Sequence, residues 1–73
     1  MKTYKNFYGS RDEYIAFCKN QVIFWAKAFY ETTDEKLRTE WALELDAAEQ
    51  SLASEGIDWD EIEKLENEAY QTV

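Results

Sequence analysis

Apolar residues return at every third or fourth position through most of this 73-residue chain, and proline is absent. Residues three and four apart share one face of an α-helix, so this spacing predicts helices with one buried side. Three segments begin with an oxygen-bearing residue that is followed three positions later by glutamate, which is the pattern of a helix-capping box. The pairs are Ser10 with Glu13, Thr32 with Glu35, and Asp58 with Glu61. We therefore expect an all-α fold with helices over about residues 11–30, 33–54 and 59–71.

The short connections between these segments predict that consecutive helices lie as antiparallel neighbours. The expected architecture is a small three-helix bundle that forms a single helical domain over residues 1–73. Gly56 follows the second segment directly, and this position is typical of a Schellman stop in which Ile57 contacts Leu52. Residues 1–9 precede the first helix and are predicted to form a short N-terminal arm.

The arm contains Tyr4, Phe7 and Tyr8, and we expect it to lie across the first helix. Ile23 and Tyr30 stand off the main apolar face of that helix, beside lysines. Exposed apolar patches generally mark a contact, so either the arm or a partner should cover these two residues.

The apolar stripes predict which residues face the core. The twelve aromatic residues matter most, because one large ring buries roughly 150–250 Å² and a chain this short has little other core. The expected inward residues are Ile15, Cys18, Val22, Trp25 and Phe29 on the first helix, Leu37, Trp41, Leu45, Ala48 and Leu52 on the second, and Trp59, Ile62, Leu65 and Ala69 on the third. On the first helix, Tyr14, Phe17, Phe24 and Ala28 are expected to widen this apolar face.

The residues that usually carry catalysis or bind metals are scarce. Histidine is absent and Cys18 is the only cysteine, which removes the usual nucleophile pairs, an intramolecular disulfide and a zinc site. A calcium loop that starts at Asp58 would place Ile62 at a ligand position and Glu63 where glycine is required. We therefore expect no enzyme activity, no cofactor and no metal.

The charge is strongly negative and uneven. The net charge is −8, and residues 31–73 carry fourteen acids against three bases. This excess argues against nucleic acid and anionic membranes as direct ligands, because both bind to lysine and arginine. The longest apolar run, residues 22–26, is too short to span a bilayer, and the N-terminus lacks the apolar run of a signal peptide. We expect a cytoplasmic protein, in the host cytoplasm if it is viral.

The acids of the second and third helices are the candidate partner-binding residues. If the two helices lie side by side, their carboxylates form one negative surface that can stand in for the phosphates of a nucleic acid. Such a surface suits a basic groove on another protein, for example on a nucleic-acid-binding enzyme or nuclease. The candidate residues are Glu40, Glu44, Asp46, Glu49, Asp60, Glu61, Glu63, Glu66 and Glu68.

In size, charge and missing chemistry the chain is similar to small nucleic-acid mimics, such as phage inhibitors of restriction or CRISPR nucleases. The likeness is one of class and not of any sequence motif. It implies a DNA-mimic-type inhibitor with no catalytic function of its own.

The alternative is a structural or interaction module whose acidic face only maintains solubility. A helical homodimer is one form of this alternative. Its apolar contact would use Ile23, Tyr30 and Leu43, the last of which lies opposite the core face of the second helix.

Overall fold

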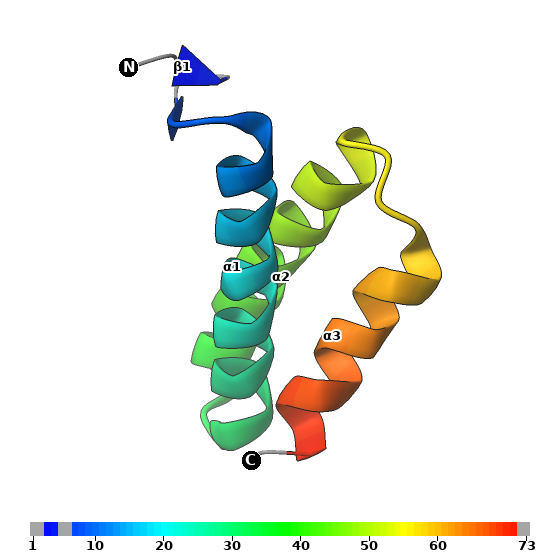
Figure 1. Ribbon diagram of the computed structural model, residues 1–73. Coiled ribbons are helices and arrows are strands. Elements are labelled where there is room, and N and C mark those ends of the chain that lie inside the picture. The colour runs from blue at the N-terminus through cyan, green and yellow to red at the C-terminus, as the bar shows by residue number, and fades with distance from the viewer. Residues whose placement is uncertain (1–2, 5–6, 72–73) are drawn as a thin grey trace.

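The structure is a computed structural model that describes residues 3–4 and 7–71, and it consists of three helices preceded by a small hairpin (Figure 1). Helix α1 spans Arg11–Glu31, α2 spans Glu35–Ser54 and α3 spans Trp59–Gln71. Strands β1 (Thr3–Tyr4) and β2 (Phe7–Tyr8) pair antiparallel. The all-α three-helix bundle expected from the sequence is confirmed. Residues 1–2 and 5–6 of the expected arm lie outside the described residues.

The first predicted cap lies where the sequence places it. The backbone N–H of Glu13 donates to Oγ of Ser10 at 3.2 Å, so Ser10 satisfies one of the free N–H groups at the start of α1. The preceding Gly9 has a φ of 148°, and a Cβ at this position would lie 2.6 Å from Oε2 of Glu13. The backbone conformation therefore favours glycine here, whereas the flexible end of the Glu13 side chain could move away from a Cβ.

The second predicted cap is wrong. Thr32 belongs to the end of α1, where its backbone N–H donates to the carbonyl of Ala28 at 3.1 Å. The cap of α2 is Asp34, whose Oδ1 accepts from the N–H groups of Lys36 at 2.9 Å and Leu37 at 3.2 Å. α1 is thus one residue longer than expected and α2 begins two residues later. Aspartate is at least as good an N-cap as threonine, so the nearer acid displaces the predicted box.

The turn between α2 and α3 has the predicted Schellman geometry. Gly56 has a φ of 86°, its N–H donates to the carbonyl of Ala53 at 3.0 Å, and the N–H of Ile57 donates to Leu52 at 3.1 Å. Asp58 then caps α3, with Oδ1 accepting from the N–H of Asp60 at 3.2 Å. The chain therefore passes from one helix to the next within four residues.

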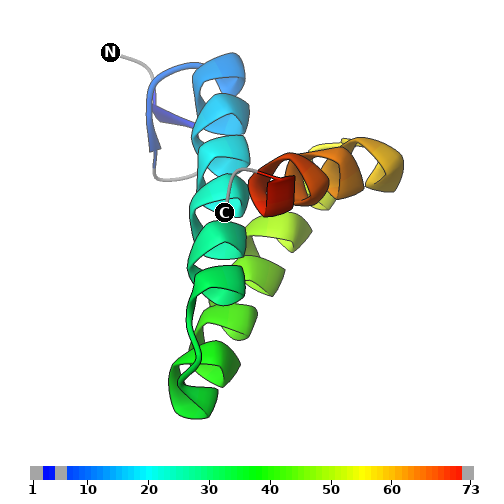
Figure 2. The same cartoon turned by 90° about the horizontal axis from the view of Figure 1, so that it is seen from below.

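Helix α1 is the central element of the bundle. α2 runs back along α1, and α3 lies on another side of α1 and shares few contacts with α2. Figure 2 shows α1 and α2 side by side while α3 projects away from them. The two later helices therefore share only a small contact and do not lie alongside each other over their full lengths. Within the described residues, no helix is both long enough and apolar enough to cross a membrane.

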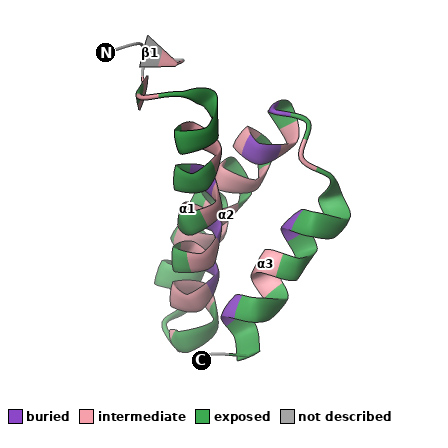
Figure 3. Cartoon of the chain, in the orientation of Figure 1, coloured by how far each residue is buried: buried purple, intermediate pink, exposed green. Residues whose placement is uncertain are grey.

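The core lies on the inward sides of the three helices (Figure 3). Cys18, Val22, Leu52 and Ile62 form one buried cluster, and partly buried side chains surround it. Cys18 is a buried free thiol and fills space as a small apolar residue, as its place in the stripe suggested. The surrounding residues are Tyr14, Ile15, Leu45, Ala48, Ala53, Ile57 and Leu65.

Four residues expected on the apolar faces of the helices are exposed. Two of them are Phe17 and Phe24 on α1, and the other two are Leu37 and Trp59. Leu37 lies in the first turn of α2, and Trp59 begins α3 and is 48% exposed. Both stand at the ends of helices where no neighbouring helix covers them. Ala26 is fully buried instead, because a small side chain allows the close approach of the helices around the middle of α1.

The hairpin does not cover Ile23 and Tyr30. Its aromatic rings contact the first turns of α1, with Tyr4 at 5.2 Å from Tyr14 and Phe7 at 5.3 Å from Phe17 between ring centroids. A strand of two residues spans about 7 Å, whereas Ile23 lies about 18 Å along the helix axis from its start. The described strands therefore lie near the start of α1 and do not reach the two residues that the arm is expected to cover.

Helix α3 reaches this side of α1 instead. Nζ of Lys19 lies 3.2 Å from Oε1 of Glu61, and the rings of Tyr30 and Tyr70 meet at 4.9 Å between centroids. Ile23 lies between Lys19 and Tyr30 on the same helix face and is partly buried. Contact between early residues of both helices, and between late residues of both, means that α3 runs in the same sense as α1.

Candidate partner-binding surfaces

Three of the candidate acids converge where α2 and α3 meet. The Glu49 carboxyl is hydrogen-bonded to that of Glu66, and Asp46 lies close enough to add its charge. Partial burial, then the bond to Glu66 and the charges of Glu66 and Asp46, raise the pKa of Glu49 from 4.5 to about 8. At neutral pH Glu49 is therefore largely protonated and adds little negative charge of its own. We call Asp46, Glu49 and Glu66 the acid junction.

Three further candidates lie on the exposed surface of α3. Asp60, Glu63 and Glu68 are exposed. Within the described part of the chain, the ion pairs are Arg11 with Glu55 and Lys19 with Glu61. The charges of these three α3 acids therefore remain directed at solvent.

Glu61 differs from its neighbours on α3. Its Oε1 accepts from Nζ of Lys19 at 3.2 Å, so α1 supplies a cation that offsets this charge. The contact is exposed, and exposed pairs of this kind contribute little to stability. Glu61 therefore adds less to the negative surface than the sequence suggested.

Glu40 and Glu44 lie apart from the acid junction. They line a hollow between α1 and α2, together with Trp25, Trp41 and Leu43. Glu44 and Asp46 are two residues apart, which places their side chains about 200° apart around α2. The nine candidate acids therefore do not form one continuous sheet of charge. Asp46, Glu49 and Glu66 lie where α2 and α3 meet, Glu40 and Glu44 lie between α1 and α2, and Glu61 lies beside α1.

The apolar candidates are also distributed over different surfaces. Tyr30 contacts Tyr70 of α3, and Ile23 is partly buried on the same face. Leu43 is 68% exposed and stands at the hollow between α1 and α2. Of the three, Leu43 is the residue most accessible to a partner.

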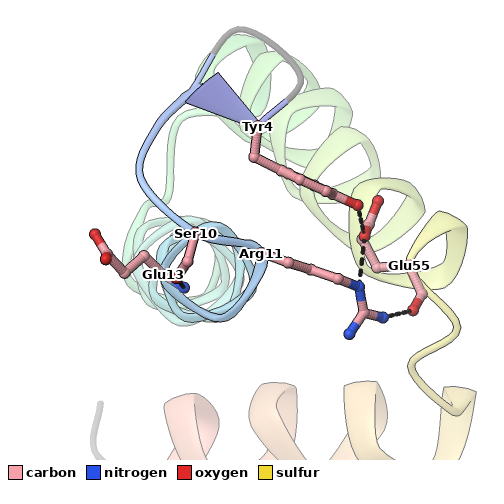
Figure 4. Close-up of polar contacts among 5 residues, drawn as sticks. All are labelled: Tyr4, Ser10, Arg11, Glu13 and Glu55. Atoms are coloured by element: carbon pink, nitrogen blue, oxygen red, sulfur yellow. Dashed lines mark hydrogen bonds and ion pairs between the residues drawn. The ribbon is translucent and has the colours of Figure 1, made fainter. Parts of the chain in front are cut away.

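Sequence reasoning missed a role for Glu55. Its side chain is almost fully buried, and its Oε1 accepts from Nε of Arg11 at 3.2 Å and from the hydroxyl of Tyr4 (Figure 4). Nη2 of Arg11 also donates to the backbone carbonyl of Glu55 at 2.6 Å. Glu55 thus joins the hairpin, the start of α1 and the end of α2. A single glutamate just before the Schellman glycine gave no signal of this, because the contacts span more than forty residues of sequence.

Sequence reasoning also missed the aromatic hollow. Two adjoining hollows, of about 170 and about 350 Å³, share Trp25 and Glu44 as lining residues. The first lies over Cys18 and Ala48 and has Phe17 among its lining residues. The sequence predicts Trp25 and Trp41 in the core, but in the structure both are only partly buried and line the hollow between α1 and α2.

A metal centre is not formed by the described residues, since no group of three or more histidine, cysteine, aspartate or glutamate side chains is arranged to hold an ion. Comparison with known proteins gives no relative. No family model, curated protein or solved structure matches the chain. Function must therefore be inferred from the acids and the aromatic hollow described above.

Proposed function

We propose that this protein is a non-enzymatic, cytoplasmic inhibitor that binds and blocks a basic, nucleic-acid-binding surface of another protein. The observation that supports this proposal is the acid junction, where Asp46, Glu49 and Glu66 meet and where partial burial, followed by the two neighbouring acids, raises the pKa of Glu49. Gathering like charges lowers the stability of a small domain. Repulsion between carboxylates that lowers the stability of the fold is typical of a surface retained for binding.

The charge balance supports the same proposal. Fourteen acids and three bases lie in residues 31–73, and Glu55 and Glu61 are the acids that form ion pairs within the described residues. Asp60, Glu63 and Glu68 are exposed on α3, so this helix presents a negative surface to solvent. Long-range attraction from such a surface accelerates docking on a basic groove.

The partner class that best fits this surface is a nuclease or another enzyme with a groove for nucleic acid. Carboxylates then occupy the positions that phosphates would take, as in a DNA mimic. A phage-encoded anti-CRISPR or anti-restriction protein is the form of this function that matches the size and charge of the chain. The enzyme would be blocked by occupancy of its groove and not by chemistry.

The test is a charge reversal on α3. Glu63 and Glu68 are suitable because both are exposed, whereas Glu61 pairs with Lys19 and Glu66 with Glu49. A panel of restriction and CRISPR nucleases would be loaded with labelled duplex DNA, and the protein titrated in to measure displacement of the DNA. We expect the double variant Glu63→Lys/Glu68→Lys to keep its helical circular dichroism and to lose displacement. Undiminished displacement by a folded double variant would refute the proposal.

The exposure of Leu43 favours a second candidate, a homodimeric interaction module. A leucine of this kind on an otherwise polar helix surface commonly marks a contact. Sedimentation at high concentration would then give a dimer, and Leu43→Glu would give a folded monomer. A monomeric unmodified protein would exclude this candidate.

A further inference from the structure

The two hollows between α1 and α2 form one groove, because Trp25 and Glu44 line both of them. The groove combines indole rings from each helix with two carboxylates, Glu40 and Glu44. Phe17 and Leu43 stand exposed at its edges. The groove is therefore mainly apolar and contains two negative charges. It lies on the opposite side of α2 from the acid junction.

The indole of Trp25 is fixed in position. Its Nε1–H donates to Oε1 of Gln21 at 3.1 Å, and its ring meets Phe24 edge-on at 4.9 Å between centroids. The hydrogen-bonding group of the indole is thus already satisfied within α1. What Trp25 still offers to a ligand is the face of its ring, which attracts a cation.

We propose that this groove binds an arginine side chain carried by an apolar segment of the partner. A guanidinium can stack on the indole faces while its N–H groups reach Glu40 or Glu44. The same pair of helices already holds one guanidinium in this way, since Cζ of Arg38 lies 4.5 Å from the ring centroid of Phe29. Phe17 and Leu43 would contact the apolar residues that flank the arginine.

Charge complementarity selects this occupant over a second copy of the chain. None of the described residues that line the groove is a lysine or arginine, and each copy carries a net charge of −8. A two-fold contact would place the same patch of each copy against the other, and Glu40 and Glu44 would then oppose each other. A cationic, apolar segment meets no such repulsion.

This inference rests on the proposed function insofar as the partner is basic, but it concerns a separate surface. Loss of binding in the groove and loss of binding at the α3 acids can therefore be measured independently. The groove variant is Glu40→Gln/Glu44→Gln, which removes two charges from exposed residues with little change of shape. The matched control is Glu63→Gln/Glu68→Gln, which removes two charges from the exposed surface of α3.

The probe is a short helical peptide of leucine and arginine, compared with the same peptide in which citrulline replaces arginine. Citrulline keeps the shape of the side chain and removes its charge. Binding would be followed by tryptophan fluorescence in a Trp59→Phe background, so that the emission comes from Trp25 and Trp41. We expect the arginine peptide to shift the emission and the citrulline peptide to bind at least about tenfold more weakly.

The expected result in the variants is a loss of about tenfold or more in affinity for Glu40→Gln/Glu44→Gln and little change for Glu63→Gln/Glu68→Gln. Equal losses in both variants would mean that charge acts non-specifically, and this would overturn the groove proposal while leaving the proposed function standing. Equal binding of the two peptides, no binding of either, or a dimer in sedimentation that Leu43→Glu dissociates would also overturn it. The opposite outcome is also possible to recognise. If the arginine peptide binds the groove but Glu63→Lys/Glu68→Lys does not alter DNA displacement, only the proposed function is refuted.

Discussion

Glu55, the residue that caps the end of α2, differs from the exposed acids on that helix. It is buried and bonded to Arg11 and Tyr4, whereas Glu40, Glu44 and Asp46 are exposed. A buried carboxylate requires such partners, because an unpaired charge in the interior is strongly unfavourable. Glu55 therefore belongs to the scaffold and not to the binding surface.

Replacing Glu55 should consequently lower stability and leave binding unchanged. We expect Glu55→Ala to decrease the free energy of unfolding by about 1–3 kcal/mol, because the donors on Arg11 and Tyr4 lose their acceptor. Urea denaturation followed by circular dichroism measures this change. Glu68→Ala is the control, as its side chain is exposed. Equal stabilities of the two variants would contradict the structural role of Glu55.

Glu49 gives a prediction about pH. Its pKa is about 8 in the folded chain against an ordinary value of 4.5, so between these values the folded state binds more protons than the unfolded state. The free energy of unfolding must then fall as pH rises from about 4.5 to about 8. The contribution of the protonated Glu49 to stability is complete only below pH 4.5. No histidine titrates in the same range.

The measurement is urea denaturation at about pH 5.5 and at about pH 8 for the unmodified protein and for Glu49→Gln. We expect the unmodified protein to be less stable at the higher pH and the variant to lose most of this difference. Groups other than Glu49, such as the α-amino group, affect both proteins alike. The same pH dependence in both would show that Glu49 does not carry the raised pKa.

At the scale of single elements, replacement of the glycine that follows α2 should lower the free energy of unfolding by a measurable amount. Gly56 has a φ of 86°, and a Cβ added to it would meet no neighbouring atom within 4 Å, so the effect of a substitution is one of backbone conformation and not of collision. We expect Gly56→Ala to lower the free energy of unfolding by about 1–2 kcal/mol, and Gly56→Asn by less, because asparagine tolerates this conformation better. Thermal unfolding would compare them, and an alanine variant as stable as the unmodified protein would contradict the Schellman assignment.

The elements themselves could be predicted largely from the sequence. Caps and stops are local, so Ser10, Gly56 and Asp58 identified helix ends from neighbouring residues alone. The one cap that failed shows the limit of this reasoning, because Thr32 and Asp34 are both suitable and only their bonds in three dimensions distinguish them. The hairpin was also missed, since two residues per strand are too few to give an alternating pattern.

At the scale of the whole molecule, the arrangement of α3 decides what kind of surface the acids form. α3 lies on α1 and shares few contacts with α2. Asp46, Glu49 and Glu66 converge at the acid junction, while Glu40 and Glu44 line the groove between α1 and α2. The sequence predicted which residues are acidic and on which helices they lie. It could not predict this division, because the division depends on the angle between α2 and α3, which no local pattern encodes.

The central claim is that the exposed carboxylates of α3 bind a basic surface, and the salt dependence of that binding tests it most directly. The dissociation constant for a nuclease whose DNA is displaced would be measured between about 50 and 200 mM salt for Glu63→Lys/Glu68→Lys and for a control, Asp12→Lys/Glu31→Lys. The control makes the same change of charge at two exposed positions of α1. A lysine in the first turn is unfavourable to the helix dipole and a lysine at the last residue is favourable, so the two effects on helix stability offset each other. We predict that affinity of the unmodified protein falls by about tenfold or more over this range, that the α3 variant loses binding, and that the α1 variant retains most of it. Binding that is insensitive to salt, or lost equally in both variants, would contradict the claim.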